Sequence, residues 1–334
     1  MLAWVHARLW TGGTVMKLGR RSILVAGLVV MAAVALTGFE LRPRHGVCTN
    51  RNIMFWRTGI RTTPLRDNLY MLQAYGTDLI NGNTVALIGD EGVLLVDPGH
   101  PELLARERSA LPQRGDFRIR FVIDSHAHPD HACANGEAFK EGAIIVGHSN
   151  IKKFFDTDPS APPRQTGDTP QLTYDDQMTL RFDGEQVHLI HPADAHTDAD
   201  TITIFPRANV ISTGDVFING NWPYMKRGSI DGYIAAEKLV LDLANDNTLI
   251  VPGHGPLARR ADVLKSYQRM VEVRRRIAAL VAQGLSEEQV SARHPIDDLD
   301  AYVGDPSGRR ELTSTASVTR YVYRSLKAKA GAAQ

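Results

Sequence analysis

Short apolar runs, broken by clusters of Gly, Pro, Asn and Asp, follow one another along most of the chain. In the run Phe117–Ile123, apolar residues recur at every second position, at Phe117, Ile119, Phe121 and Ile123. This period of two predicts a strand with those side chains on one face. The same criteria predict further strands at Asn68–Tyr75, Asn83–Ile88, Val93–Asp97, Ala143–Gly147, Met178–Phe182, Gln186–Ile190, Thr201–Phe205, Val210–Ser212 and Thr248–Val251.

Helical periodicity appears between and after these runs. In Ile230–Leu243, an apolar stripe is predicted from Ile234, Leu239, Val240 and Leu243. The other predicted helices are Pro101–Leu111, Asn135–Lys140, Asn150–Phe155, Ala261–Gln283, Glu287–His294 and Ser317–Lys329. Strands in two sets, each followed by helices, predict an α/β fold in which two sheets pack together with helices outside.

The composition is that of an ordinary globular protein. Of the 334 residues, 43% are hydrophobic and 22% are charged. The net charge is +1, without a long block of one sign, so we expect no nucleic-acid partner. We expect one domain over residues 68–330, after an irregular lead-in at 40–67, and an exposed loop at Asp156–Pro170.

The N-terminal segment has the features of an export signal. Arg20 and Arg21 precede Ser22–Phe39, which has no charged residue, and its apolar centre is short for a membrane span. We expect residues 1–39 to be a signal peptide for Sec or twin-arginine export to the periplasm. An uncleaved inner-membrane anchor is the alternative, and only then would the protein contact a membrane. Met16 is the better start for such a signal, and residues 1–15 would then lie upstream of the true start.

The loop after the strand Phe117–Ile123 concentrates metal-ligand side chains. His126, His128, Asp130 and His131 fall within six positions, and in extended chain the first two point the same way. Imidazoles and a carboxylate in such proximity suit a borderline-soft divalent cation such as zinc.

Three further ligand types follow strands later in the chain. His196 lies between the strands Gln186–Ile190 and Thr201–Phe205, Asp215 follows Val210–Ser212, and His254 follows Thr248–Val251. Each stands at a strand-to-loop junction, where a rigid scaffold can present a side chain to a cleft.

The pattern His-x-His-x-Asp-His, with those later residues, resembles the signature of the metallo-β-lactamase superfamily, roughly from Asn68 to Arg260. The resemblance implies an αβ/βα four-layer sandwich with two metal ions at one edge. It assigns His126, His128 and His196 to the first ion, Asp130, His131 and His254 to the second, and Asp215 to both. Two zinc ions are expected, with iron or manganese as alternatives.

The implied reaction is hydrolysis by a metal-bound hydroxide of a small ester, lactone, thioester or β-lactam. Asp130 would orient the nucleophile and accept its proton. Asp215 stands where the best-known zinc β-lactamases carry Cys or Ser, which disfavours antibiotic hydrolysis as the main role. The alternatives are a mononuclear iron oxidoreductase resembling persulfide dioxygenases and a thioesterase resembling glyoxalase II. A flavodiiron-type oxidase is disfavoured because it normally has Glu in place of His128.

Other residues are expected to support the site. Asp97 resembles the family's buried aspartate that hydrogen-bonds the metal loop, and His191 is expected to contact a ligand or the substrate. Trp222, Tyr224 and Lys226 are candidates for a substrate pocket, with packing onto the core as the alternative for the two aromatic residues. The expected partner is a small molecule, and the sequence sets no oligomeric state.

Cys48 and Cys133 are the two cysteines of the chain. An exported protein can pair them, yet two cysteines make no disulfide framework, so the sequence leaves the pairing open. Pairing would tether the N-terminal extension to the loop that carries His126 to His131.

Overall fold

The computed structural model describes residues 58–75, 81–113, 115–157, 166–299 and 314–332. The chain divides into two compact units, Met1–His45 and Gly46–Gln334, and everything described below belongs to the second. Among the described residues, no helix is both long and apolar enough to span a membrane. The expected signal peptide at 1–39 lies outside the described residues.

The first sheet has the strand order β1-β2-β3-β4-β5-β6-β7. Strands β1 to β4 pair antiparallel, and β4 to β7 pair parallel. Their bounds are Gly59–Pro64 (β1), Leu69–Tyr75 (β2), Thr84–Gly89 (β3), Gly92–Val96 (β4), Ile119–Ile123 (β5), Ile144–His148 (β6) and Leu172–Tyr174 (β7).

The second sheet comes from the second half of the chain and has the order β12-β11-β10-β9-β8. Only the β11–β12 pair is parallel among these described strands. The bounds are Gln177–Phe182 (β8), Glu185–Ile190 (β9), Ile202–Phe205 (β10), Val210–Ser212 (β11) and Leu249–Val251 (β12).

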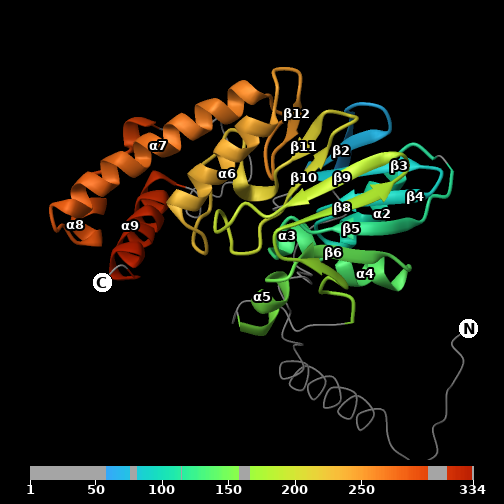
Figure 1. Cartoon of the computed structure of the whole chain (residues 1–334), viewed down its shortest axis with the longest axis horizontal. Helices are drawn as coiled ribbons and strands as arrows, with labels where there is room; N and C mark the ends of the chain where they lie inside the picture. Colours follow the sequence, from blue (N-terminus) through green and yellow to red (C-terminus); the bar gives the residue numbers. More distant parts are fainter. Residues whose placement is uncertain (1–57, 76–80, 114, 158–165, 300–313, 333–334) are drawn as a thin grey trace, which may run out of the picture. The chain divides into compact units, whose positions relative to one another are not determined.

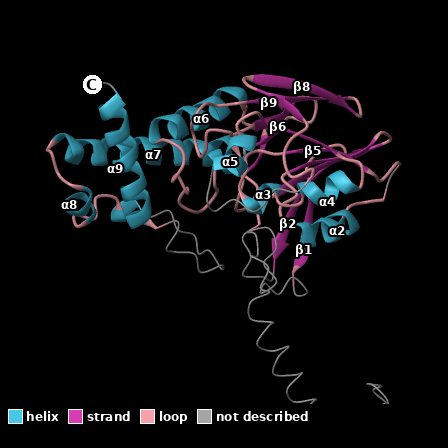
Figure 2. Ribbon diagram, turned by 90° about the horizontal axis from the view of Figure 1, so that it is seen from below, coloured by secondary structure: helices cyan, strands magenta, loops and turns pink. Residues whose placement is uncertain are grey.

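Helices cover the outer faces of both sheets (Figures 1 and 2). Their bounds are Pro101–Ala110 (α2), Pro129–Ala132 (α3), Asn135–Lys140 (α4), Ile151–Thr157 (α5), Ile230–Leu243 (α6), Arg260–Ala282 (α7), Glu287–Ser291 (α8) and Thr315–Ala332 (α9). Short 3₁₀ turns lie at Gly214–Val216 (η2) and Asp297–Leu299 (η3).

Three apolar clusters define four layers. One lies between the sheets and joins residues such as Val85 and Ile123 of the first to Leu189 and Phe205 of the second. A second packs α2 and α4 on the outer face of the first sheet. A third packs α6 and the start of α7 on the outer face of the second. The predicted αβ/βα sandwich is therefore confirmed.

A fourth cluster holds the C-terminal helices together. Met270 of α7, Val290 of α8 and Val318 of α9 pack with Trp222 and Tyr233, all buried. The helices α8 and α9 are thus anchored to the sandwich through α6, α7 and the segment that follows η2.

Two expectations about individual strands are wrong. The side chains of Phe121 and Ile123 enter the core between the sheets, whereas Ile119 faces the outer cluster. A β-bulge causes the change, because Val93 pairs with Ile119 but Leu94 pairs with Phe121, leaving one extra residue on β5. The lead-in at 40–67 contains strand β1, an edge strand without fully buried residues, whose sequence therefore lacks clear alternation.

The apolar stripe predicted for α6 is also displaced. Leu243 is 41% exposed, while Tyr233, Glu237 and Val240 are buried. The buried face of this helix therefore includes a carboxyl group and a phenol, which apolar periodicity alone does not reveal.

Candidate metal centre

Four predicted ligands form a first cluster at one edge of the sandwich. His126 and His128 come from the loop after β5, His196 from the loop between β9 and β10, and Asp215 from η2. Nδ1 of His128 lies 2.8 Å from Nε2 of His126 and 2.8 Å from Nε2 of His196. Nε2 of His196 lies 3.5 Å from Oδ2 of Asp215.

Hydrogen bonding alone cannot account for this arrangement. A ring nitrogen has either one hydrogen or one lone pair, so Nδ1 of His128 cannot bond well to both neighbours. Burial, reinforced by neighbouring imidazoles, lowers the pKa of His126 well below its ordinary value and that of His128 to about 3. Burial also lowers the pKa of His196. Neutral imidazoles whose nitrogens converge on one point are suited to a cation.

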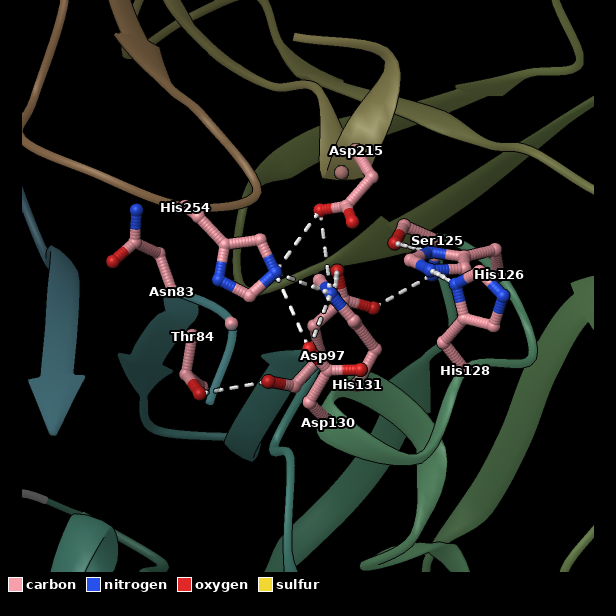
Figure 3. Close-up of polar contacts among 12 residues, drawn as sticks. Asn83, Thr84, Asp97, Ser125, His126, His128, Asp130, His131, Asp215 and His254 are labelled. Atoms are coloured by element: carbon pink, nitrogen blue, oxygen red, sulfur yellow. Dashed lines mark hydrogen bonds and ion pairs between the residues drawn. The ribbon is translucent and has the colours of Figure 1, made fainter. Parts of the chain in front are cut away.

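The remaining predicted ligands form a second cluster, drawn in Figure 3. Nε2 of His131 lies 3.3 Å from Nε2 of His254, which lies 3.3 Å from Oδ2 of Asp130. Oδ1 of Asp215 lies 3.3 Å from the first of these imidazole nitrogens and 3.4 Å from the second. A tetrahedral zinc ion with bonds of about 2.0–2.2 Å separates its ligand atoms by roughly 3.3–3.6 Å. The second cluster therefore fits such an ion.

The two oxygens of Asp215 serve different clusters. Oδ2 faces His196 of the first, and Oδ1 faces His131 and His254 of the second. This is the placement that a bridging carboxylate requires in a site for two cations. The donor set of imidazoles and carboxylates is compatible with a divalent metal.

The charges of the second cluster differ from those of the first. Burial opposes protonation of His131 and His254, but the nearby carboxylates of Asp215 and Asp130 outweigh it. The pKa of His131 is raised well above its ordinary value and that of His254 to about 9. Conversely, these imidazoles overcome burial and hold the pKa of Asp130 well below its ordinary range.

Asp97 lies behind the second cluster. Its Oδ2 is 3.0 Å from Nδ1 of His131, and its Oδ1 accepts a hydrogen bond of 2.7 Å from the backbone N–H of Ser125. The residue has a left-handed backbone (φ 55°), and its carbonyl accepts a 2.7 Å bond from the Thr84 hydroxyl. Asp97 thus fixes both a ligand ring and the start of the metal loop, as the family resemblance implies.

The segment before β3 joins the two halves of the chain at this cluster. The Asn83 side chain donates to the carbonyls of Pro252 (2.8 Å) and Gly255 (2.9 Å), on either side of His254. Its backbone N–H donates to the carbonyl of Gly253. Gly82 donates its N–H to Asp130, and a Cβ on it would lie 2.5 Å from the His131 ring, so only glycine fits there.

The first cluster is supported by a residue that the sequence did not single out. Oδ2 of buried Asp200 accepts hydrogen bonds from the backbone N–H groups of His196 (2.7 Å) and Thr197 (2.9 Å). Burial raises the pKa of Asp200 to about 7. In sequence it resembles its neighbours Asp194 and Asp198, which are more exposed, and only burial distinguishes it.

His191 does not contact a ligand side chain in any described interaction. Its ring stacks on that of His148 at a centroid distance of 3.9 Å, and its Nδ1 lies 2.7 Å from the carbonyl of Asp200. It therefore contacts the backbone of Asp200, the residue that holds the His196 turn.

The three residues predicted for a substrate pocket lie in different surroundings. Trp222 is 1% exposed, packs in the C-terminal cluster beneath the Arg269 guanidinium and does not line the site, because its indole fills the core between helices. Lys226 is exposed. Tyr224 lies against the first cluster, with its ring centroid 5.9 Å from that of His128 and 6.2 Å from that of His196.

Cys133, which follows α3 and its ligands Asp130 and His131, is disulfide-bonded. The other cysteine of the sequence is Cys48, outside the described residues. The loop that carries Asp130 and His131 is therefore followed directly by a disulfide.

A model of the metallo-beta-lactamase superfamily matches residues 77–276, more than half of the chain. The fold and this match show that the chain belongs to that superfamily, which contains metallo-hydrolases and oxidoreductases. The candidate metal centre lies within the matched range.

Solved structures agree with the fold. A metallo-beta-lactamase from Pontibacter korlensis is similar with a TM-score of 0.53 and 16% identity, covering 64% of this chain and 99% of its own. The stereoselective inverting sec-alkylsulfatase Pisa1 from Pseudomonas sp. gives a TM-score of 0.60 and 14% identity, covering 80% of this chain and 50% of its own. At these identities the likeness concerns the fold alone.

A coenzyme F420H(2) oxidase from Methanothermobacter marburgensis is 38% identical over 84 residues. The match spans 24% of this chain and only about a fifth (19%) of that relative.

Proposed function

We propose that the protein is a dinuclear zinc hydrolase that cleaves a small ester, lactone or thioester, with β-lactams as poorer substrates. The observation that carries the proposal is the position of Asp215, whose two oxygens face two separate clusters of ligands. Zinc ions held there would lower the pKa of a bound water to about 7 and polarise the bond that is cut.

Residues of the chain would orient the attacking water and provide a base for its proton. The Asp130 side chain is partly exposed at 16%, and a divalent cation held by the second cluster would keep its carboxylate ionised. A carboxylate in this position can hold a water by one oxygen and accept its proton. Asp97 and Asn83 keep the His131 ring and the His254 turn in place during this step.

Leaving-group chemistry favours esters and lactones over β-lactams. The amine of a β-lactam leaves only with protonation or anionic stabilisation, whereas an alcohol leaves more readily. Asp215 stands where the best-known zinc β-lactamases carry Cys or Ser. Its carboxylate adds negative charge relative to Ser and replaces the soft thiolate of Cys with a hard oxygen ligand. The solved relatives named as metallo-beta-lactamases and as an alkylsulfatase support hydrolysis as the general reaction.

An iron oxidoreductase is the second candidate, and the oxidase relative favours it. Its support is limited to 84 aligned residues, and His128 stands where flavodiiron-type oxidases normally have Glu. The two candidates differ in the metal they require.

We further propose that the protein is exported to the periplasm. The charge-free Ser22–Phe39 after Arg20-Arg21 supports this, as does the disulfide at Cys133, since disulfides persist in oxidising compartments.

The experiment is metal analysis of protein purified without added metal, followed by kcat/KM for 4-nitrophenyl acetate, a γ-lactone, a thioester and a penicillin. We expect zinc, and a higher kcat/KM for the ester or lactone than for the penicillin. Iron with dioxygen consumption, or a penicillin preferred over every ester and lactone, would contradict the proposal.

A further inference from the structure

The matched family range ends at residue 276, within α7, so α8 and α9 lie beyond it. They are nonetheless part of the compact molecule, because Val318 and Val322 of α9 are fully buried against α7. The same helix places Tyr321 against Tyr224, which contacts the first cluster.

Tyr321 reaches the first metal cluster through one other ring. Its centroid lies 5.5 Å from that of Tyr224 in an edge-to-face contact, and Tyr224 in turn contacts His128 and His196. Both tyrosines are partly exposed. Burial of each phenol raises the pKa of Tyr224 and Tyr321, so both side chains remain neutral.

A third aromatic ring approaches the same histidine from α5. The centroid of Phe154 lies 6.2 Å from that of His128, again edge to face. The Arg227 guanidinium lies over this ring at 4.8 Å, which stabilises its position by a cation–π contact. Phe154, Tyr224 and Tyr321, here called the aromatic rim, therefore come from three separate elements and gather beside the first cluster.

We infer that the aromatic rim binds the acyl group of the substrate and that α9, through Tyr321, makes the protein selective for aromatic acyl groups. This deepens the proposed hydrolytic function and rests on it. Partly exposed rings beside a metal cluster offer edge-to-face partners to an incoming phenyl group, and a small aliphatic acyl group gains little from them. A hydrophobic contact of this size changes selectivity by roughly 3- to 10-fold per ring.

Two esters with the same leaving group and different acyl groups show the effect of the acyl group alone. The first measurement compares kcat/KM for 4-nitrophenyl phenylacetate and 4-nitrophenyl acetate with the zinc-loaded enzyme. We expect the phenylacetate to be preferred, and Tyr321→Ala and Phe154→Ala each to lower that preference by about 3- to 10-fold. Tyr321→Phe should retain it, since the ring is kept.

A matched control lies two residues away on α9. The Tyr323 hydroxyl donates to the carbonyl of Leu285 and takes no part in the rim, so Tyr323→Phe should leave the preference unchanged. Metal content should be equal in all variants, because none of these residues is a ligand.

The second measurement does not require turnover. Calorimetry compares the affinities of phenylacetate and acetate for the zinc-loaded protein, with circular dichroism to confirm folding and Tyr321→Leu as a second variant. A preference for phenylacetate that falls in Tyr321→Ala and Tyr321→Leu supports the inference even if neither ester is hydrolysed, in which case only the proposed function fails. Equal preference in wild type and both variants overturns the inference, whether or not hydrolysis is seen.

Discussion

The two metal clusters share Asp215 but are constructed differently. In the first, burial leaves neutral imidazoles, and the pKa of His128 falls to about 3. In the second, carboxylates keep His131 and His254 protonated, and the pKa of His254 rises to about 9. A metal ion can bind the first cluster without displacing protons from its imidazoles, whereas binding to the second must release them.

The hydrogen bonds that hold the ligands of the two clusters in place differ as well. The backbone N–H groups of His196 and Thr197 donate to the Asp200 carboxylate, three or four residues away, so the turn that carries the first-cluster ligand is fixed locally. The turn that carries His254 is fixed by Asn83, on the other half of the chain. The second cluster therefore depends on the docking of the two sheets and should be the more sensitive to distant substitutions.

The largest effect is expected from Asp215→Asn, because this residue alone faces both clusters. The amide loses one anionic oxygen, so the affinity for both ions should fall and kcat/KM should drop by more than about 100-fold. Metal analysis and ester hydrolysis check this, with the exposed Asp194→Asn as the control. Unchanged ester hydrolysis would show that Asp215 does not bridge.

A selective effect is expected from Asn83→Ala. Without its amide, the carbonyl of Pro252 loses its side-chain donor and that of Gly255 keeps only the one from Gln73. The His254 turn is then tied to residue 83 by a single backbone hydrogen bond. The affinity for the second ion should fall by about 10- to 100-fold while the first ion stays bound. Competitive titration with a chelating dye measures both constants.

Asp200→Asn is the corresponding variant for the first cluster. It should lower the affinity for the first ion more than the affinity for the second. If both variants weakened the two ions equally, the two clusters would not be independently supported.

Much of the centre could be predicted because its ligands lie at strand ends with fixed spacing, and Asp97 follows a buried strand in the same way. Asp200 and Asn83 could not, because their importance comes from burial and from hydrogen bonds across the fold. For Trp222 the sequence left a pocket and the core as alternatives, because an aromatic residue near a ligand packs equally well into a core, and the structure shows the core. Tyr321 lies far from the motif in sequence, and only helix packing brings it to the site.

A smaller effect is expected on the free energy of unfolding, through Glu107, which is not a predicted ligand. Burial raises the pKa of Glu107 from 4.5 to about 8, and its Oε1 lies 2.9 Å from the Thr84 hydroxyl that bonds Asp97. The native state therefore keeps a proton that the unfolded chain loses above about pH 4.5. Stability should decline as pH rises from there and level off above about 8, by on the order of a few kcal/mol.

Glu107→Gln should flatten this decline, because the amide does not titrate. Urea unfolding across this pH range measures it, and Glu102→Gln, on the exposed face of the same helix, is the control. If the free energy of unfolding fell with rising pH equally in the wild type and in Glu107→Gln, Glu107 would not be the cause of the decline.

The most direct test of the dinuclear centre is the metal content of the wild type and of His254→Ala, each loaded with zinc and freed of excess ion. The proposed function predicts two zinc ions per wild-type chain and one in His254→Ala, which keeps His126, His128 and His196 intact. Calorimetry should also show more proton release for the ion that the variant loses. One ion in both proteins, with equal hydrolytic activity, would contradict the account.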